Sequence, residues 1–209
     1  MKNNNYLLVL IILFPLTLTA QQRLDKSEKY LGVSAGATGA MVGFSPAVGQ
    51  DYLLGYNGGF IYRYIADTYV GVQIELNYAR QGWHEPATDF SRQLSYIELP
   101  FLTHVYLGKK SRFIVNIGPQ LGYLINDRKT KTPAESKEVQ HVKQAQNSFD
   151  YGFALGTGFC FSVNKNIFQL EARAYYAMGD IYSNAKTEYF SRSNNMKLSL
   201  NLSWLLQVK

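Results

Sequence analysis

The chain has 209 residues, which is enough for one domain with a sizeable interior. Aromatic residues make up 14% of it, with 16 Tyr and 12 Phe, whereas charged residues make up only 17%. The formal net charge of +6 is spread without a long block of like charges, and this excludes a typical nucleic-acid-binding surface. A single cysteine, Cys160, excludes a scaffold held together by internal disulfides.

The N-terminal segment has the layout of a secretory signal peptide. Lys2 precedes an apolar run at residues 6–18, and small residues follow the run. A permanent membrane anchor is the alternative, but the run is short and contains Pro15. The sequence therefore predicts a signal peptide at residues 1–20 and one exported domain at residues 21–209. No later apolar stretch is long enough to cross a membrane as a helix.

The exported part repeats one unit, an alternating segment followed by a break, and shows no comparable helical period. Short breaks such as ADT, GKKS and VNKN alternate with long ones at residues 43–53, 80–91, 126–148 and 179–194. Short turns at one end and long loops at the other are typical of an outer-membrane barrel. The expected strands are residues 30–42, 54–66, 69–80, 93–107, 112–126, 149–162, 167–178 and 195–208.

The segment VGVQIELNYA at residues 70–79 shows the alternation most clearly. Val72, Ile74 and Leu76 share one face with further aliphatic residues, and Glu75 lies on the other face. The same parity along the chain gathers bulky aromatic residues on the aliphatic face and glycines with polar groups on the opposite face. An eight-stranded barrel has an interior only wide enough for side chains to fill it. We therefore expect the apolar face to point outward, toward lipid.

Aromatic residues on this outward face are expected to form two girdles around an aliphatic band, as in membrane barrels. β-Propensity alone is the alternative explanation for their number, although not for their banding. The girdle residues are Tyr62, Tyr64, Phe113, Phe159, Phe161 and Trp204 near the short turns, and Tyr78, Tyr123, Tyr151 and Tyr176 near the long loops.

The inward face is expected to hold a network of charged and polar groups. Isolated charges in so narrow a space are costly, so they should pair and form hydrogen bonds. One hypothesis is a polar plug that keeps the lumen closed, and the other is a narrow path for ions or small solutes. The charged members of this lumenal network are Arg63, Glu75, Glu98, Glu171, Arg173 and Lys197.

Signs of an enzyme are weak. His84, His104 and His141 lack metal-ligand spacing, so we expect no metal and no other cofactor. His84, Asp89 and Ser91 share one predicted outer loop and could form a nucleophile set, but such a combination arises readily by chance. We therefore predict that the protein is not an enzyme.

Three segments carry a family resemblance: YIELPFLTHVYLG at residues 96–108, NIGPQLGYLI at residues 116–125, and FDYGFALGTGFCF at residues 149–161. They resemble strands of the PorT-like and OmpA-type small outer-membrane β-barrel families. The resemblance implies an all-β, eight-stranded, antiparallel up-and-down transmembrane barrel in the cell outer membrane, inserted by the barrel assembly machinery. Many such barrels end on an aromatic residue, whereas this chain ends WLLQVK, where Trp204 could take that part.

The leading functional hypothesis is a structural or surface-interaction protein with a largely plugged polar lumen and long outer loops. Trp83, Tyr182, Tyr189 and Phe190 in these loops are candidates for outside contacts. The expected partners are outer-membrane lipid and lipopolysaccharide, with no nucleic acid and with no external partner identified. A narrow porin-like channel is the first alternative, and a soluble exported barrel that binds an apolar ligand is the second.

Overall fold

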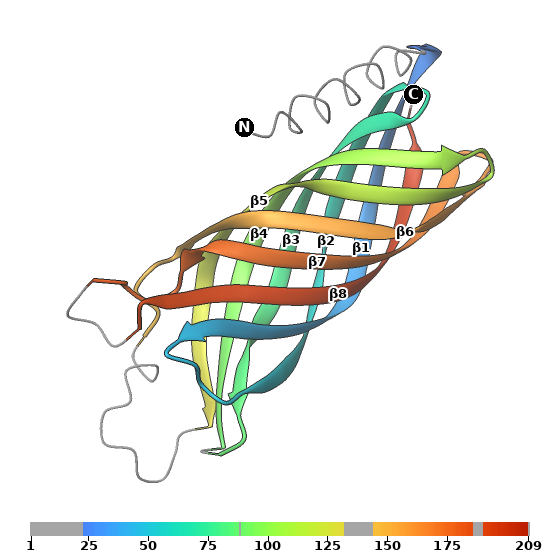
Figure 1. The fold of residues 1–209 in the computed structure, drawn as a ribbon. Helices are drawn as coiled ribbons and strands as arrows, with labels where there is room; N and C mark the ends of the chain where they lie inside the picture. Colours follow the sequence, from blue (N-terminus) through green and yellow to red (C-terminus); the bar gives the residue numbers. More distant parts are fainter. Residues whose placement is uncertain (1–22, 88, 132–143, 186–189, 209) are drawn as a thin grey trace, which may run out of the picture.

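The computed structural model describes residues 23–87, 89–131, 144–185 and 190–208, and the expected signal peptide lies outside this part. The strands form one closed antiparallel barrel in chain order, in which β1 pairs with both β2 and β8 (Figure 1). This confirms the expected fold class. The strands are β1 (Arg23–Ser45), β2 (Asp51–Asp67), β3 (Val70–Glu85), β4 (Phe90–Gly108), β5 (Ser111–Lys131), β6 (Phe149–Val163), β7 (Asn166–Asp180) and β8 (Arg192–Gln207). No helix in the described residues is both long and apolar enough to span a membrane.

The alternation in β3 determines which face is inside. Val72 and Leu76 expose about half of their surface, at 50% and 51%, and point outward. Gln73 and Glu75 are buried, at 0% and 2% exposure. Because successive side chains of a strand point to opposite faces, the polar residues of β3 lie inside the barrel and the aliphatic residues outside. The same arrangement runs along β6, β7 and β8.

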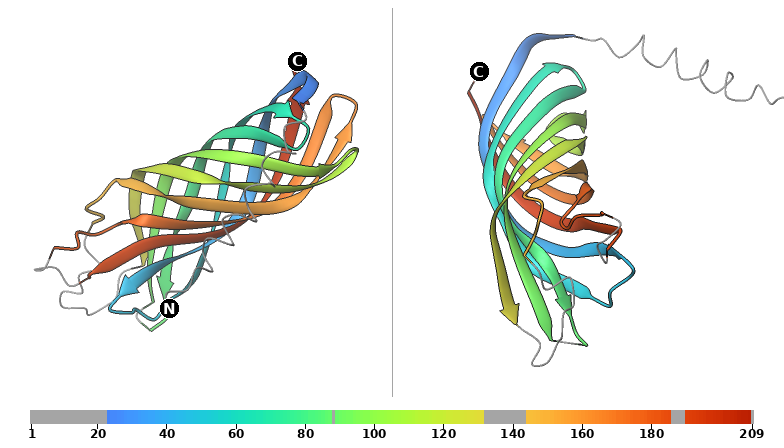
Figure 2. Two further views of the ribbon diagram at one scale, coloured as in Figure 1. Left: turned by 45° about the horizontal axis from the view of Figure 1, so that its top comes forward. Right: turned by 90° about the vertical axis from the view of Figure 1, so that its left-hand side faces the viewer.

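The two ends of the barrel differ. Tight turns at residues 68–69, 109–110 and 164–165 gather at one end, which we call the turn end (Figure 2). Gly108 and Asn164 have positive φ angles of 116° and 56° at two of these turns, a conformation that glycine and asparagine adopt with little strain. The opposite end, which we call the loop end, carries the other connections.

The first two outer connections are shorter than the sequence suggested. They span only residues 46–50 and 86–89, because β2, β3 and β4 continue through most of the predicted loops. β5 likewise runs to Lys131, and Arg128 pairs with Gln93 of β4. The prediction of long loops at 43–53 and 80–91 was therefore wrong. Strand pairing extends beyond the expected aliphatic band on this side of the barrel.

Candidate functional site

The interior of the barrel is the candidate site, and its side chains form three successive layers. A group of buried apolar residues lies at the turn end, polar and charged residues occupy the middle, and a second apolar group lies at the loop end. We call the first group the turn-end cluster: Tyr30, Ile61, Ile65, Tyr106, Ile114, Cys160, Ile167 and Leu205. The loop-end cluster is Val42, Phe44, Trp83, Phe90, Leu94, Tyr96, Ile181, Tyr182 and Phe190.

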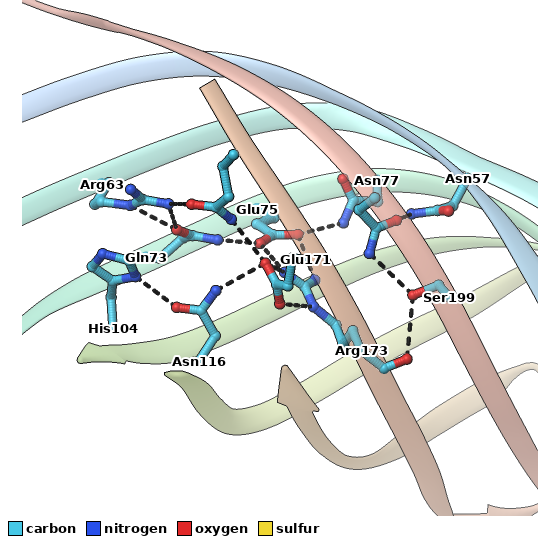
Figure 3. Close-up of polar contacts among 12 residues, drawn as sticks. Asn57, Arg63, Gln73, Glu75, Asn77, His104, Asn116, Glu171, Arg173 and Ser199 are labelled. Carbon is cyan, nitrogen blue, oxygen red and sulfur yellow. Dashed lines mark hydrogen bonds and ion pairs between the residues drawn. The ribbon is translucent and has the colours of Figure 1, made fainter. Parts of the chain in front are cut away.

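Arg173 lies at the centre of the polar middle (Figure 3). Its Nη1 and Nη2 atoms donate to both carboxylate oxygens of Glu75, at 2.8 and 2.7 Å. Its Nε and Nη2 atoms also donate to Glu171, at 2.8 and 3.1 Å. β3 and β7 are four strands apart in an eight-strand ring, so the pair between Glu75 and Arg173 crosses the lumen from wall to wall. All three side chains are buried.

Neutral amides surround both carboxylates. Glu171 accepts hydrogen bonds from Asn116 and Gln169, each at 2.9 Å. Glu75 accepts them from Gln73 at 2.5 Å and from Asn77 at 2.8 Å. A buried ion pair is stable only when the remaining lone pairs are also satisfied, and these amides meet that requirement.

Arg63 is held differently from Arg173. Its guanidinium donates to the amide oxygen of Gln73 at 2.8 and 2.5 Å, and to that of Gln169 at 2.5 Å. These two amides connect Arg63 to Glu75 and Glu171 without a direct ion pair. Arg63 and Arg173 are thus linked with Glu75 and Glu171 in one continuous hydrogen-bond network (Figure 3).

Glu98 and Lys197 form a second ion pair. Lys197 Nζ donates to both oxygens of Glu98, at 2.5 and 2.7 Å, and lies 5.4 Å from the centre of the Tyr175 ring. β4 and β8 also face each other across the barrel. Asn195 bridges the same two walls, because its amide donates to the hydroxyl of Tyr96 at 3.2 Å. The structure therefore buries all six sequence-predicted lumenal residues, in two separate ion-paired groups.

Glycines on the inner face provide room for these long side chains. A Cβ atom added at Gly156 would overlap the carboxylate of Glu171. One added at Gly36 would lie 2.8 Å from the side-chain oxygen of Asn57, whose amide nitrogen donates to the side-chain oxygen of Asn201 at 2.8 Å. The many glycines of the inward face thus match the polar side chains that lie against them.

Arg92 anchors the loop-end cluster. It donates to both oxygens of Asp127, at 2.7 and 2.5 Å, and to the hydroxyl of Tyr182 at 2.8 Å. Its guanidinium lies 5.8 Å from the centre of the Trp83 ring. Burial alone would raise the pKa of Asp127, but hydrogen bonds from Arg92 and the amide of Ala145, with the charge of Arg92, hold that pKa below its usual range.

Sequence reasoning missed this cluster. Trp83, Tyr182 and Phe190 were expected in outer loops, whereas each of them is buried. Tyr189 lies outside the described residues. The signal was present in the parity of β3, because Trp83 shares the inward face with Glu75, but the strand was assumed to end at residue 80.

The residues named for the aromatic girdles all lie on the outer face. Near the turn end, Phe113 of β5 and Phe159 of β6 lie side by side on neighbouring strands, with ring centres 5.4 Å apart. Near the loop end, Tyr123 is 58% exposed and Tyr176 is 48% exposed. Tyr64 and Tyr78 are only half-buried, and Tyr78 donates to Ser95 at 3.0 Å.

The candidate nucleophile set is only partly brought together. His84 Nδ1 lies 2.7 Å from Ser91 Oγ, but the two residues are cross-strand partners on β3 and β4 rather than members of one loop. His104 lies in the polar middle, 2.7 Å from the amide oxygen of Asn116. His141 falls outside the described residues. Among the described residues, no group of His, Cys, Asp and Glu is placed to hold a metal.

Among solved structures similar to this chain, the first supports the barrel fold and two others show a weaker similarity. The outer membrane protein OprG from Pseudomonas aeruginosa shares 9% identity, with 87% of this chain and 96% of that chain covered and a TM-score of 0.55. The attachment invasion locus protein Ail of Yersinia pestis shares 15% identity over 86% of this chain and 99% of that chain, with a TM-score of 0.46. The E. coli outer membrane protein W shares 12% identity over 87% and 99%, with a TM-score of 0.45. No curated protein matches the chain.

A family model identifies the chain more directly. The model described as an outer membrane protein beta-barrel domain matches residues 19–183, which is most of the sequence. The closed barrel, its apolar exterior and its buried polar interior are the features expected of such a domain. This protein belongs to the family of outer membrane protein beta-barrel domains.

Proposed function

We propose that the lumen of this outer-membrane barrel is closed to solutes and that the protein has a structural or surface-interaction role. The observation that carries the proposal is the bidentate ion pair between Glu75 and Arg173, which spans the lumen between opposite walls. Glu98 and Lys197 span it a second time. The turn-end and loop-end clusters add apolar layers on either side of these pairs. A hydrated ion would have to break buried, charge-assisted bonds to pass.

Conductance across a planar lipid bilayer tests the closed lumen. The full protein, refolded in detergent and inserted into the bilayer, should give no stable conductance steps. Insertion is verified by heat-modifiable gel mobility of the same preparation, since folded membrane barrels stay compact in cold SDS. Stable, reproducible unit conductance from inserted protein would overturn the proposal.

A narrow channel is the second candidate, and one observation favours it. The buried side chains of Asn57, Asn77 and Gln81 include amide atoms without a hydrogen-bond partner among the described residues. Buried polar groups of this kind commonly bind internal water. A row of bound water molecules along β2 and β3 would form part of a path for solutes through the lumen. The same conductance measurement decides between the two functions.

The remaining elements of the proposal concern export and partners. Residues 1–20 would be removed on export, and the resemblance carried by residues 96–108, 116–125 and 149–161 favours a PorT-like barrel. Outer-membrane lipid, lipopolysaccharide and the barrel assembly machinery are the proposed partners, and the role is not enzymatic. Mass spectrometry of the protein purified from outer membranes should give an N-terminus at Gln21. A chain that retained residues 1–20 there would contradict the export step.

A further inference from the structure

β6 and β7 separate before they reach the loop end. Their last paired residues are Gly152 and Ala177, although both strands continue beyond this point. Farther out the two segments meet again, because the backbone N–H groups of Gln146 and Asn147 donate to the carbonyl oxygen of Ile181 at 3.1 and 3.0 Å. The barrel wall therefore contains a stretch in which β6 and β7 are not hydrogen-bonded to each other.

A pocket of about 440 Å³ lies at this place, and we call it the β6–β7 pocket. Its size suits one or two small rings rather than a protein segment. Its lining combines side-chain amides, aromatic rings and one carboxylate. The lining residues are Gln146, Asn147, Ser148, Phe149, Tyr151, Met178, Gly179, Asp180, Tyr182 and Asn184.

The amides on the loop side of the pocket retain hydrogen-bonding capacity. The side-chain carbonyl oxygen of Gln146 accepts from the backbone N–H of Ser183 at 2.6 Å, so its NH₂ group has no hydrogen-bond partner among the described residues. The side-chain NH₂ group of Asn147 donates to the backbone carbonyl oxygen of Asp180 at 2.8 Å, so its side-chain carbonyl oxygen has no hydrogen-bond partner among the described residues. Donors and acceptors are thus both available along this edge.

The membrane side of the pocket is apolar. Phe149 and Tyr151 stack with ring centres 6.1 Å apart and an interplanar angle of 27°. Both rings are about half exposed, as is Met178. Tyr151 belongs to the aromatic residues that face outward near the loop end. The pocket therefore joins the lipid-facing surface to the outer aqueous side.

The charge of the lining limits the ligand. No Lys, Arg or His is among the ten described lining residues, so none of these residues offers a cation to a phosphate or sulfate group. The carboxylate of Asp180 already accepts from the backbone of Ser193 at 2.6 Å and from Asn184 at 3.3 Å. Uncharged hydroxyl groups suit the amides, and the C–H face of a sugar ring suits the aromatic pair.

We propose that the β6–β7 pocket binds a neutral sugar ring. The ring could belong to a glycolipid of the outer leaflet or to a soluble saccharide, and the amide and aromatic chemistry is the same for both. This inference rests on the proposed surface-interaction role and names the chemistry of its partner.

Binding is measured by microscale thermophoresis on the full protein in phosphatidylcholine nanodiscs. One arm uses nanodiscs that also contain rough lipopolysaccharide, a second replaces it with lipid A, and a third adds the free core oligosaccharide released from that lipopolysaccharide. Affinity for a core-bearing probe that exceeds affinity for lipid A supports the inference. Binding in the first arm alone identifies a glycolipid as the source, and equal binding in the third arm identifies the free sugar.

Two pocket variants and two controls assign the binding to this pocket. Tyr151→Leu removes an aromatic face, and the double variant Gln146→Ala with Asn184→Ala removes two amides. Each should weaken sugar binding about five- to tenfold. Tyr123→Leu and Asn126→Ala remove an outward aromatic and an exposed polar side chain that do not line the pocket, and both should bind as the parent does.

Three results would overturn the inference: no binding in any arm, equal binding to lipid A and to the core-bearing probes, or pocket variants with parental affinity. The closed lumen is judged separately by conductance. A barrel that does not conduct and binds no sugar would refute sugar binding at the β6–β7 pocket but not the closed lumen. A barrel that conducts would refute the proposed function.

Discussion

The carboxylate of Glu171 on β7 lies against the backbone of Gly156 on β6, a diagonal neighbour whose own cross-strand partner is Arg173. A Cβ atom at Gly156 would collide with a group that Arg173 and Asn116 hold in place. The missing side chain of Gly156 on β6 therefore provides the space that the long side chain of Glu171 on β7 occupies. This pairing leads to the first prediction.

Gly156→Ala should destabilise the barrel by about 1–3 kcal/mol, the range typical of overpacking a well-filled interior. The added methyl group displaces a buried carboxylate and strains its hydrogen bonds from Asn116, Gln169 and Arg173. Urea unfolding in lipid vesicles, followed by heat-modifiable gel mobility, measures the change. Gly122→Ala is the matched control, because a Cβ atom there meets its nearest neighbour at 3.4 Å and should cost little. Equal stability of the two variants would contradict the packing argument.

Arg173→Met should be more damaging than Arg63→Met. Removing Arg173 leaves Glu75 and Glu171 buried without a directly bonded cation, a loss of about 3–5 kcal/mol when one partner of a buried pair is deleted. Removing Arg63 leaves the amide oxygens of Gln73 and Gln169 without this donor, but both carboxylates keep their direct bonds to Arg173, so the expected loss is about 1–3 kcal/mol. The same urea titration measures both variants.

The control for this comparison restores neutrality in the lumen. A double variant with Arg173→Met and Glu171→Gln should recover part of the stability lost in Arg173→Met, because one cation, Arg63, and one carboxylate, Glu75, then remain in the group. A double variant less stable than the single one would show that the charges are not the source of the loss.

Much of this interior could be predicted from the sequence, and the reason is physical. Within the bilayer, lipid surrounds the barrel, so Leu76 points out and Glu75 points in, and parity alone assigns each residue to a face. Beyond the bilayer, water surrounds the same strand. There Trp83 points in and His84 is only half-buried on the other face, so the hydrophobic face changes sides. A single rule for the whole strand therefore failed at the loop end.

Strand pairings across the lumen could not be predicted for another reason. The partners of Lys197 depend on which residue of β4 stands opposite, and that depends on the stagger of every strand between them. Alternation fixes the face of a residue but not its height in the barrel. The sequence therefore predicted the members of the lumenal network as a set, whereas the pair between Lys197 and Glu98 required the structure.

Trp83→Ala should weaken the loop-end cluster without opening the barrel. The tryptophan is fully buried against Phe44, with ring centres 5.3 Å apart, and its loss should cost about 3–5 kcal/mol at most. The pair between Glu75 and Arg173 still crosses the lumen, so bilayer conductance should stay absent. Phe60→Ala, at an outward aromatic residue that is 70% exposed, serves as the control for the loss of an aromatic side chain. Conductance in Trp83→Ala but not in the parent would show that the loop-end cluster alone closes the lumen.

Acid should loosen the loop-end cluster through Asp127. The pKa of Asp127 is lowered in the folded protein, so its contribution to stability is complete above the unfolded value of about 3.9 and is lost as the pH falls through the folded value. Protonation removes the ion pair with Arg92, which itself lies against Trp83. The chain has two tryptophans, so a Trp204→Phe background isolates the emission of Trp83. That emission should shift to longer wavelength only below about pH 4. Asp127→Asn in the same background should show no pH-dependent shift in this range, and a shift of the same size in it would assign the transition to another group.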